Sequence, residues 1–207
     1  MTTTEQRLTS EVDTKMKHAG EWVFTRLPRP DHPPFRSAER AANLLLDFIG
    51  PGARILCMRD QCLRPVRELA LERGLDLIVP SKDGNMVYKL PLGAIYDSAT
   101  RKRTPLVIEP LPTGSRRYVG VVDAVVVGCL GFSERERQLY SYDTDRTASI
   151  LECMYEGLAN GFRLNPDTPV LCIAADCQEV AAWPVEAQSY VRASAVITPS
   201  RTILLNH

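Results

Sequence analysis

The most apolar stretch of the chain lies at residues 119–132, where a run of valines closes on Gly128. A short, unbroken apolar run that is rich in β-branched residues is typical of a strand buried on both faces, as in the middle of a parallel sheet. We therefore predict an interior parallel strand at residues 121–127, with Gly128 at its carboxyl end. Its expected neighbours are the strand-like runs at 53–57 and 169–174.

Helix-like and strand-like segments alternate along the rest of the chain. Apolar positions spaced three or four residues apart predict a helix that starts after Ser37 and stops at Gly50. Pro65 and Gly74 bracket a second helix. Further strands are expected at 75–80, 87–90 and 194–198, and a further helix at about 146–158. This alternation predicts an α/β fold with a mainly parallel central sheet and flanking helices.

Two segments fall outside the alternating pattern. Residues 1–13 are polar and Thr-rich without periodicity, so we expect a loose tail there, followed by a helix over 15–27. Residues 91–117 are rich in Pro, Arg and Lys and predict a long surface excursion. The chain from 14 to 207 has a length that fits one domain.

Composition narrows the classes of partner. The chain has 25 basic and 25 acidic side chains and a formal net charge of zero, so no global field favours nucleic acid or a membrane. No apolar run approaches the roughly 20 residues of a bilayer span, and no secretory signal is visible at the amino end. We expect a cytoplasmic protein with a small-molecule substrate; oligomeric state cannot be inferred.

Cysteine spacing raises the question of a metal or redox site. The spacing C-x4-C occurs twice, but the three His residues lie far from both pairs. Free cysteine in an apolar strand behaves as a small apolar residue. We expect reduced thiols and no bound metal, while a metal or redox pair stays open as the alternative. The six are Cys57, Cys62, Cys129, Cys153, Cys172 and Cys177.

Four segments together resemble one known family. In chain order they read PPFRSAERAANLL (33–45), LRPVRELALERG (63–74) with a strand ending in Val79-Pro80, VDAVVVGCLGF (122–132) and SAVITPSRTI (194–203). They are similar to the 5-formyltetrahydrofolate cyclo-ligase (methenyltetrahydrofolate synthetase) family, over about residues 15–203. The resemblance implies a NagB/RpiA/CoA-transferase-like α/β fold. It also implies that ATP phosphorylates the formyl oxygen, N10 attacks, and phosphate leaves to give 5,10-methenyltetrahydrofolate.

The loop after the central strand departs from the family. Its relatives read Arg-Leu-Gly-Tyr-Gly-Gly-Gly-Tyr-Tyr-Asp-Arg, whereas residues 137–146 here read RQLYSYDTDR, without a glycine. Glycines let backbone amides approach phosphate oxygens closely, with no Cβ in the way. Tyr140 and Tyr142 would fill that space instead. We therefore predict that ATP is not held in the family's manner, so ATP and Mg²⁺ are implied by the resemblance alone.

The resemblance also implies roles for individual residues. It makes Asp145 and Arg146 catalytic candidates, with Mg²⁺ and phosphate as their partners. Tyr142 is a further catalytic candidate from the residues themselves, because with Tyr140 and Asp143 it forms a hydroxyl-and-carboxylate cluster that could serve a new ligand. Each candidate has a structural alternative: Asp145 also suits the first turn of a helix, and the tyrosine a packed loop. Arg137 and Lys15 are the candidates for nucleotide binding.

Four further residues are candidates for substrate binding: Phe35, Glu39, Arg67 and Gln178. Phe35 would stack on a pteridine and Glu39 would accept its ring N–H groups, or these two are a core aromatic and an exposed helix residue. Arg67 would hold an anionic tail, or lie on a solvated helix face. Gln178 is a further candidate, because the family has a Gln there.

Three functions follow from these features. The first is a divergent cyclo-ligase-like enzyme that closes a ring by activating a formyl or amide oxygen. The second is a non-catalytic binding or regulatory module on the same scaffold. The third is an ATP-independent enzyme that acts on another small molecule in the same place. Fold alone does not choose among them.

Overall fold

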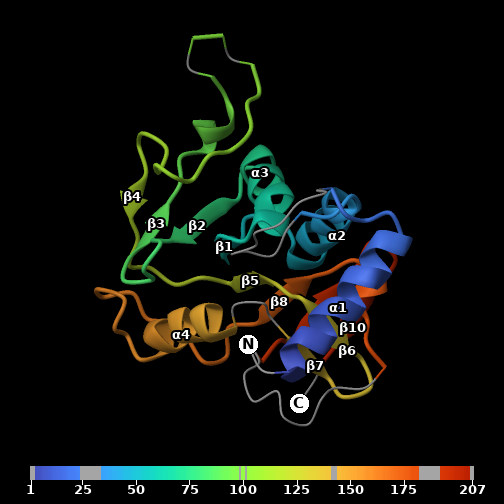
Figure 1. Cartoon of the computed structure of the whole chain (residues 1–207). Helices are drawn as coiled ribbons and strands as arrows, with labels where there is room; N and C mark the ends of the chain where they lie inside the picture. Colours follow the sequence, from blue (N-terminus) through green and yellow to red (C-terminus); the bar gives the residue numbers. More distant parts are fainter. Residues whose placement is uncertain are drawn as a thin grey trace.

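A computed structural model describes residues 3–23, 34–97, 99–100, 102–140, 144–181 and 192–205, with the side chains of 3–6, 8 and 144–148 left outside the description. Eight strands form one sheet in the order β10-β9-β8-β5-β1-β2-β3-β4 (Figure 1). The strands are β1 Arg54–Cys57, β2 Asp76–Pro80, β3 Val87–Lys89, β4 Arg116–Arg117, β5 Ala124–Gly128, β8 Val170–Ile173, β9 Ala195–Ile197 and β10 Thr202–Leu204. The inner five, β9 to β2, run parallel, and the pairings of β10 with β9, β3 with β2 and β4 with β3 are antiparallel.

The valine run forms the interior strand that its pattern predicts. β5 pairs in parallel with β1 on one side and with β8 on the other. Val126 lies opposite Cys57 in β1 and Leu171 in β8, and every residue of β5 is buried. The strand begins at Ala124 rather than at 121. The prediction of an α/β fold with a mainly parallel central sheet and flanking helices is therefore confirmed. The NagB/RpiA/CoA-transferase-like topology stays a prediction.

Three helices flank the sheet as expected. They are α2 Ala38–Ile49, α3 Arg64–Glu72 and α4 Thr144–Tyr155. In Figure 1, α2 and α3 lie on one side of the sheet and α4 on the other. Pro65 stands in the first turn of α3, and Gly74 follows its end with a φ of 72°, a conformation that favours glycine. Ser37 precedes α2, but its hydroxyl donates to Glu21 at 2.8 Å instead of capping the helix.

The amino-terminal prediction is wrong. Residues expected to form a loose tail belong to the helix α1, Thr3–His18. This helix ends at His18, whereas we expected a helix over 15–27. Val12 and Met16 are one helical turn apart and both are buried, with exposed fractions of 0% and 1%. They pack near the short 3₁₀ helix η3, Asp176–Gln178, where the Cys177 and Met16 sulfur atoms lie 3.3 Å apart. Tertiary packing of this apolar pair gives order to a polar sequence.

A separate two-stranded antiparallel sheet was not predicted. β6 Gly131–Ser133 and β7 Gln138–Tyr140 form a hairpin directly after β5, with Phe132 opposite Leu139. Its turn needs a positive φ of 55° at Arg137, which a non-glycine residue adopts here. Phe132 also bridges in parallel to Glu179, and the amide of Val180 donates to its carbonyl at 2.8 Å. The hairpin is therefore attached to the loop that follows β8.

The excursion at 91–117 carries the 3₁₀ helix η2, Leu92–Ile95, and strand β4, and it projects at the top of Figure 1. A third 3₁₀ helix, η1 Gln61–Leu63, lies between β1 and α3. None of the helices in the described ranges is long and apolar enough to cross a membrane.

Candidate functional site

The carboxyl ends of the parallel strands define one edge of the sheet. The chain leaves β1 for β2 on one side and later returns at β5 on the other, so the strand order reverses between β1 and β5. Ligands of open α/β sheets bind outside the carboxyl ends of the strands, at such a switch point. The loops after β1, β5, β8 and β9 meet there. We call this region the carboxyl edge.

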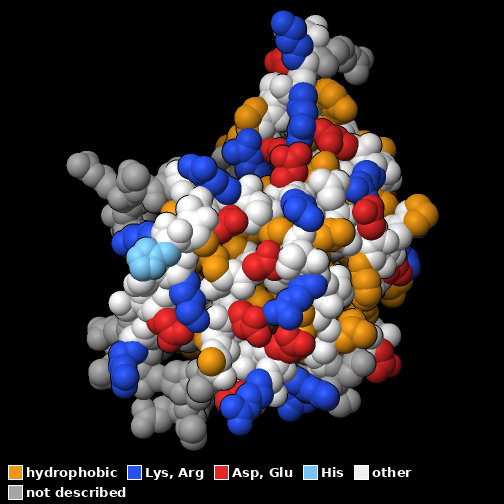
Figure 2. Space-filling view, turned by 90° about the vertical axis from the view of Figure 1, so that its right-hand side faces the viewer, with side chains coloured by type: hydrophobic (Ala, Val, Ile, Leu, Met, Phe, Trp, Pro, Cys, Tyr) orange, Lys and Arg blue, Asp and Glu red, His pale blue; other side chains and the backbone are white. Residues whose placement is uncertain are grey.

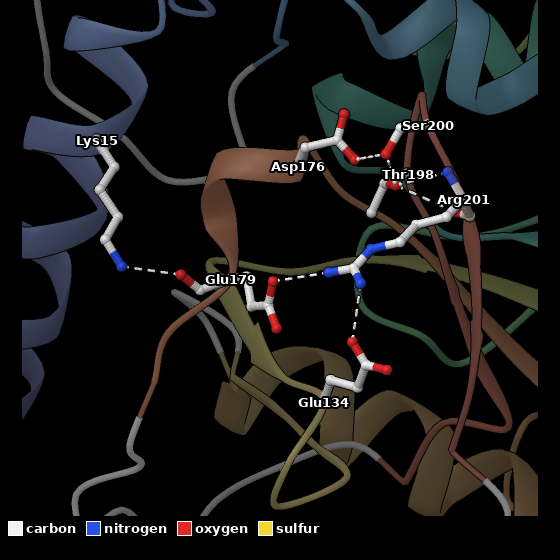
Figure 3. A network of polar contacts seen from close by, with 7 residues as sticks. All are labelled: Lys15, Glu134, Asp176, Glu179, Thr198, Ser200 and Arg201. Carbon is white, nitrogen blue, oxygen red and sulfur yellow. Dashed lines mark hydrogen bonds and ion pairs between the residues drawn. The ribbon is translucent and has the colours of Figure 1, made fainter.

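A network of ion pairs and hydrogen bonds joins three of these loops to α1 (Figure 3). Arg201, which follows β9, pairs through Nη1 with Glu134 in the hairpin turn at 3.0 Å and through Nη2 with Glu179 at 2.7 Å. Lys15 of α1 donates from Nζ to the Glu179 carbonyl at 2.8 Å and pairs with Glu11 at 2.8 Å. The hairpin, the loop after β8, the turn after β9 and α1 are thus held together.

The turn after β9 is built by its own hydroxyls. Thr198 is fully buried, and its Oγ1 donates to the Arg201 carbonyl at 3.1 Å and accepts from the Arg201 amide at 3.2 Å. Ser200 donates to the Asp176 carboxylate at the start of η3. These bonds fix the backbone from which Arg201 projects and turn its guanidinium toward the hairpin.

Negative charge dominates this network. Two cations, Lys15 and Arg201, face four carboxylates, those of Glu11, Glu134, Asp176 and Glu179. The paired side chains are between 37% and 51% exposed, so solvent screens each pair and its contribution to stability is below about 1 kcal/mol. The carboxyl edge therefore offers polar side chains that can be displaced at low cost.

Gln178 is at the carboxyl edge but is used internally. Its side chain is 6% exposed; Nε2 donates to the carbonyls of Cys129 and Leu130 at 2.8 Å each, and Oε1 accepts from the amide of Ala175 at 2.7 Å. Three of its hydrogen-bonding positions are thus occupied by backbone groups. The predicted substrate residue ties the loop after β8 to the loop after β5.

Arg67 has a similar internal role. It lies in α3 with an exposed fraction of 4%, so the solvated-face alternative is wrong. Its Nη1 donates to the carbonyls of Met58 and Asp60 at 2.7 and 3.0 Å, which holds the loop after β1. Its Nε has no hydrogen-bond partner among the described residues. Arg67 therefore holds the loop after β1 at the switch point, and an anionic tail would have to be bound by other residues.

Phe35 and Glu39, predicted to bind one ligand together, lie in different surroundings: the first is buried and the second exposed. Phe35 is 4% exposed and bridges to Trp22, which matches its alternative as a core aromatic. Glu39 is exposed in the first turn of α2, and its carboxylate makes no hydrogen bond or ion pair to another described residue. The described contacts thus do not bring the two together around one ligand.

The loop candidates are described only in part. Tyr142 lies outside the described residues, and Asp145 and Arg146 fall in the first turn of α4 with side chains outside the description. Arg137 is exposed at the hairpin turn. Tyr140 is 3% exposed in β7, beside a Leu139 that is 2% exposed, so the start of this segment is packed into the protein.

Asp60 is a candidate that the sequence reading missed. It follows β1 at the switch point, is 9% exposed, and its Oδ2 accepts from the amide of Gly128 at the end of β5, at 3.4 Å. A carboxylate three residues after the end of an apolar strand was the available signal. Its backbone carbonyl is one of the two to which Arg67 donates.

All six cysteines are free. Burial raises the pKa of Cys57 to about 11, with the nearby Arg67 guanidinium opposing the shift. Burial also raises the pKa of Cys62 and Cys172 well above that of a free thiol. Among the described residues, no group of three or more His, Cys, Asp or Glu side chains is placed to hold a metal ion.

No protein-family model matches the chain, and no curated protein matches it. Among solved structures, it is similar to eIF2B beta from Chaetomium thermophilum, with 12% identity and a TM-score of 0.47 over 81% of this chain. The chain spans about half of eIF2B beta, 52%. It is also similar to a protein of unknown function from Methanothermobacter thermautotrophicus, with 12% identity and a TM-score of 0.36, over 80% of this chain and 100% of that one. At these values neither likeness supports an inference about activity, substrate or partner.

Proposed function

We propose that this chain is a divergent relative of the 5-formyltetrahydrofolate cyclo-ligases that binds a reduced folate or a similar small molecule at the carboxyl edge and does not hold ATP as that family does. The family resemblance supplies the substrate class. The observation that carries the loss of ATP binding is the burial of Tyr140, which is 3% exposed.

Tyr140 occupies the position at which the run of three glycines begins in the loop of the cyclo-ligase family. A phosphate cradle needs backbone amides within about 3 Å of several oxygens. In β7 the backbone of Tyr140 is engaged in the hairpin, where it lies opposite Gly131, and its carbonyl accepts from the Leu130 amide at 2.7 Å. A hairpin edge with a buried phenol ring does not supply such a cradle.

Charge at the carboxyl edge favours the same conclusion. A triphosphate would face the carboxylates of Glu134, Asp176 and Glu179. Arg201 is already paired with Glu134 and Glu179, and Lys15 with Glu11 and the Glu179 carbonyl. A ligand with N–H donors, such as a pteridine, would meet acceptors instead. Ring closure without ATP would then rest on positioning of the amine against the formyl or amide carbon; as the new C–N bond forms, the carbonyl oxygen takes up the amine proton and one solvent proton and leaves as water.

A non-catalytic binding module is the second candidate. The internal use of Gln178 and Arg67 favours it, because two polar residues expected at the substrate hold backbone carbonyls instead. The same binding surface serves both candidates, so turnover separates them.

Thermal denaturation with reduced folates tests the proposal. A ligand that binds only the folded state raises the melting temperature, so 5-formyltetrahydrofolate should raise it and ATP·Mg²⁺ should not. Glu39→Ala should weaken folate binding by about 1–3 kcal/mol if the exposed Glu39 carboxylate meets ring N–H groups. Arg40→Ala, at the exposed neighbouring position, is the matched control and should bind normally. Absence of any folate-dependent shift would contradict the proposed ligand class.

A further inference from the structure

Residues 91–117, called the arm below, project from the α/β body as an ordered feature (Figure 1). Its two sides pair with each other: the amide of Thr104 donates to the Ile95 carbonyl at 2.8 Å and the amide of Asp97 to the Lys102 carbonyl at 2.9 Å. Tyr96 lies opposite Arg103 in an isolated bridge. The described residues of the arm, which leave out 98 and 101, therefore pair across it.

Polar bonds fix the arm to the body at two points. Glu68 of α3, whose side chain is 12% exposed, accepts from the Leu106 amide at 2.9 Å and from Arg103 at 3.2 Å. Arg59, directly after Met58 at the carboxyl edge, donates to the Ile108 carbonyl at 3.1 Å and pairs with Glu109 at 2.8 Å. An element held in this way loses little entropy when a partner binds it.

The arm exposes large apolar side chains that do not serve the core. Leu92, Tyr96 and Val107 are 51%, 45% and 59% exposed, whereas Ile95 and Leu106 point inward and are buried. In Figure 2, Lys and Arg side chains lie along the projecting part, with an acidic side chain near its tip and hydrophobic side chains on its flanks. Aromatic and apolar anchors together with Arg are the composition of protein–protein interfaces.

Charge indicates the nature of the partner. The arm has five basic residues and two acidic ones, a net charge of +3, so the remainder of a chain with 25 of each has 20 basic and 23 acidic residues, a net charge of −3. Asp97 is occupied within the arm, where hydrogen bonds from Thr100 lower the pKa of its carboxyl. Lys102 and Arg116 make no ion pair within the described part of the chain.

The complementary surface lies on the body of the same protein. At the carboxyl edge, the network in Figure 3 and its neighbour Glu11 leave two negative charges in excess, since four carboxylates face Lys15 and Arg201. Opposite charges on two surfaces of one chain allow each of two copies to offer both surfaces to the other.

We propose that the arm docks on the carboxyl edge of a second copy of this chain, so that the protein forms a homodimer with reciprocal arm contacts. The apolar side chains of the arm supply the buried contact area, and Lys102 and Arg116 approach the carboxylates around Glu134. The docked arm and the proposed small-molecule ligand would use the same edge, but sedimentation without ligand tests the assembly alone, so the two proposals can fail separately.

Sedimentation of the full chain tests the assembly. The dimer mass should appear at micromolar protein in low salt and fall off as the ionic strength rises toward about 0.5 M, where screening shortens to a few Å. Lys102→Glu with Arg116→Glu should raise the dimer Kd by about tenfold or more. Tyr96→Ser with Val107→Ser should do the same without altering the salt dependence. Arg73→Glu with Arg163→Glu, exposed cations outside both the arm and the carboxyl edge, is the matched control and should stay dimeric.

Mixing two variants identifies the docking surface. Glu11→Lys with Glu134→Lys reverses the acidic side, and both side chains are about half exposed, so the fold should persist. Alone, this variant and the arm-reversed variant should each sediment as monomers; mixed, they should form a heterodimer. A monomer at all salt concentrations, a dimer that ignores the arm substitutions, or a mixture that stays monomeric would each overturn the proposal. Melting curves for every variant exclude unfolding as the cause.

Discussion

The side chain of Gln178 is bonded to the backbone of Cys129: its Nε2 donates to the Cys129 carbonyl at 2.8 Å. This contact joins the loop after β8 to the loop after β5, across two neighbouring strands of the sheet. Gly131 lies close by, where a Cβ atom would come within 3.1 Å of the Gln178 carbonyl. The carboxyl edge is therefore assembled around one buried amide.

Replacing that amide should destabilise the protein. Gln178→Ala leaves the carbonyls of Cys129 and Leu130 and the amide of Ala175 without their partner in a buried site. We expect a loss of about 2–4 kcal/mol in the free energy of unfolding, measured by urea denaturation. Gln61→Ala, at an exposed position of η1, is the matched control and should change it by less than about 0.5 kcal/mol. Equal effects of the two substitutions would show that the amide does not hold these loops.

The Arg54–Asp123 pair should give stability a pH dependence. Arg54 donates to the Asp123 carboxylate from its amide, Nε and Nη2 at 2.8, 3.0 and 2.7 Å, and these bonds lower the pKa of that carboxyl. The pair therefore contributes stability above the unfolded carboxyl pKa of about 3.9, and loses it as the pH falls through the lowered folded value.

Asp123→Asn should reveal this contribution. Because the two side chains are 38% and 42% exposed, solvent screening limits it to about 1 kcal/mol near pH 7. The difference in the free energy of unfolding between wild type and variant should shrink as the pH is lowered from about 5 toward 2. Asp167→Asn, at an exposed position, serves as the control. A difference that is constant over this range would contradict the assignment.

Thiol labelling should follow burial. Cys57, Cys62, Cys129 and Cys172 are no more than 3% exposed, and burial raises the pKa of Cys57 to about 11. Iodoacetamide at pH 8 should modify Cys153 and Cys177 first, because these two are partly exposed. Peptide mass spectrometry of native and urea-unfolded protein separates the groups. Rapid labelling of Cys57 or Cys172 in the native state would show that the sheet opens at its centre.

The sequence pattern predicted those helices and strands whose signals lie within a short stretch of the chain. The valine run of β5, the three–four spacing of α2 and the Pro65–Gly74 bracket of α3 each carry their information within a dozen residues. The α1 helix was not predicted, because what orders it is the packing of a single apolar pair, Val12 and Met16, near η3.

The candidate site was less predictable because its contacts are distant in sequence. Gln178 reaches carbonyls 48 and 49 positions away, and Arg201 pairs with Glu134 from another loop. Residue types alone cannot show that Gln178 and Arg67 bond to backbone carbonyls. Lys15 was singled out for a nucleotide, and the described structure places it against Glu179 at the carboxyl edge.

Calorimetric titration with ATP·Mg²⁺, followed by an assay of 5,10-methenyltetrahydrofolate formation, tests the central claim most directly. The buried Tyr140 and the acidic carboxyl edge predict no ATP binding at micromolar concentrations and no ATP-dependent turnover of 5-formyltetrahydrofolate. Micromolar ATP binding together with robust ATP-dependent product formation by the purified protein would contradict the account and restore ATP-dependent cyclo-ligase chemistry.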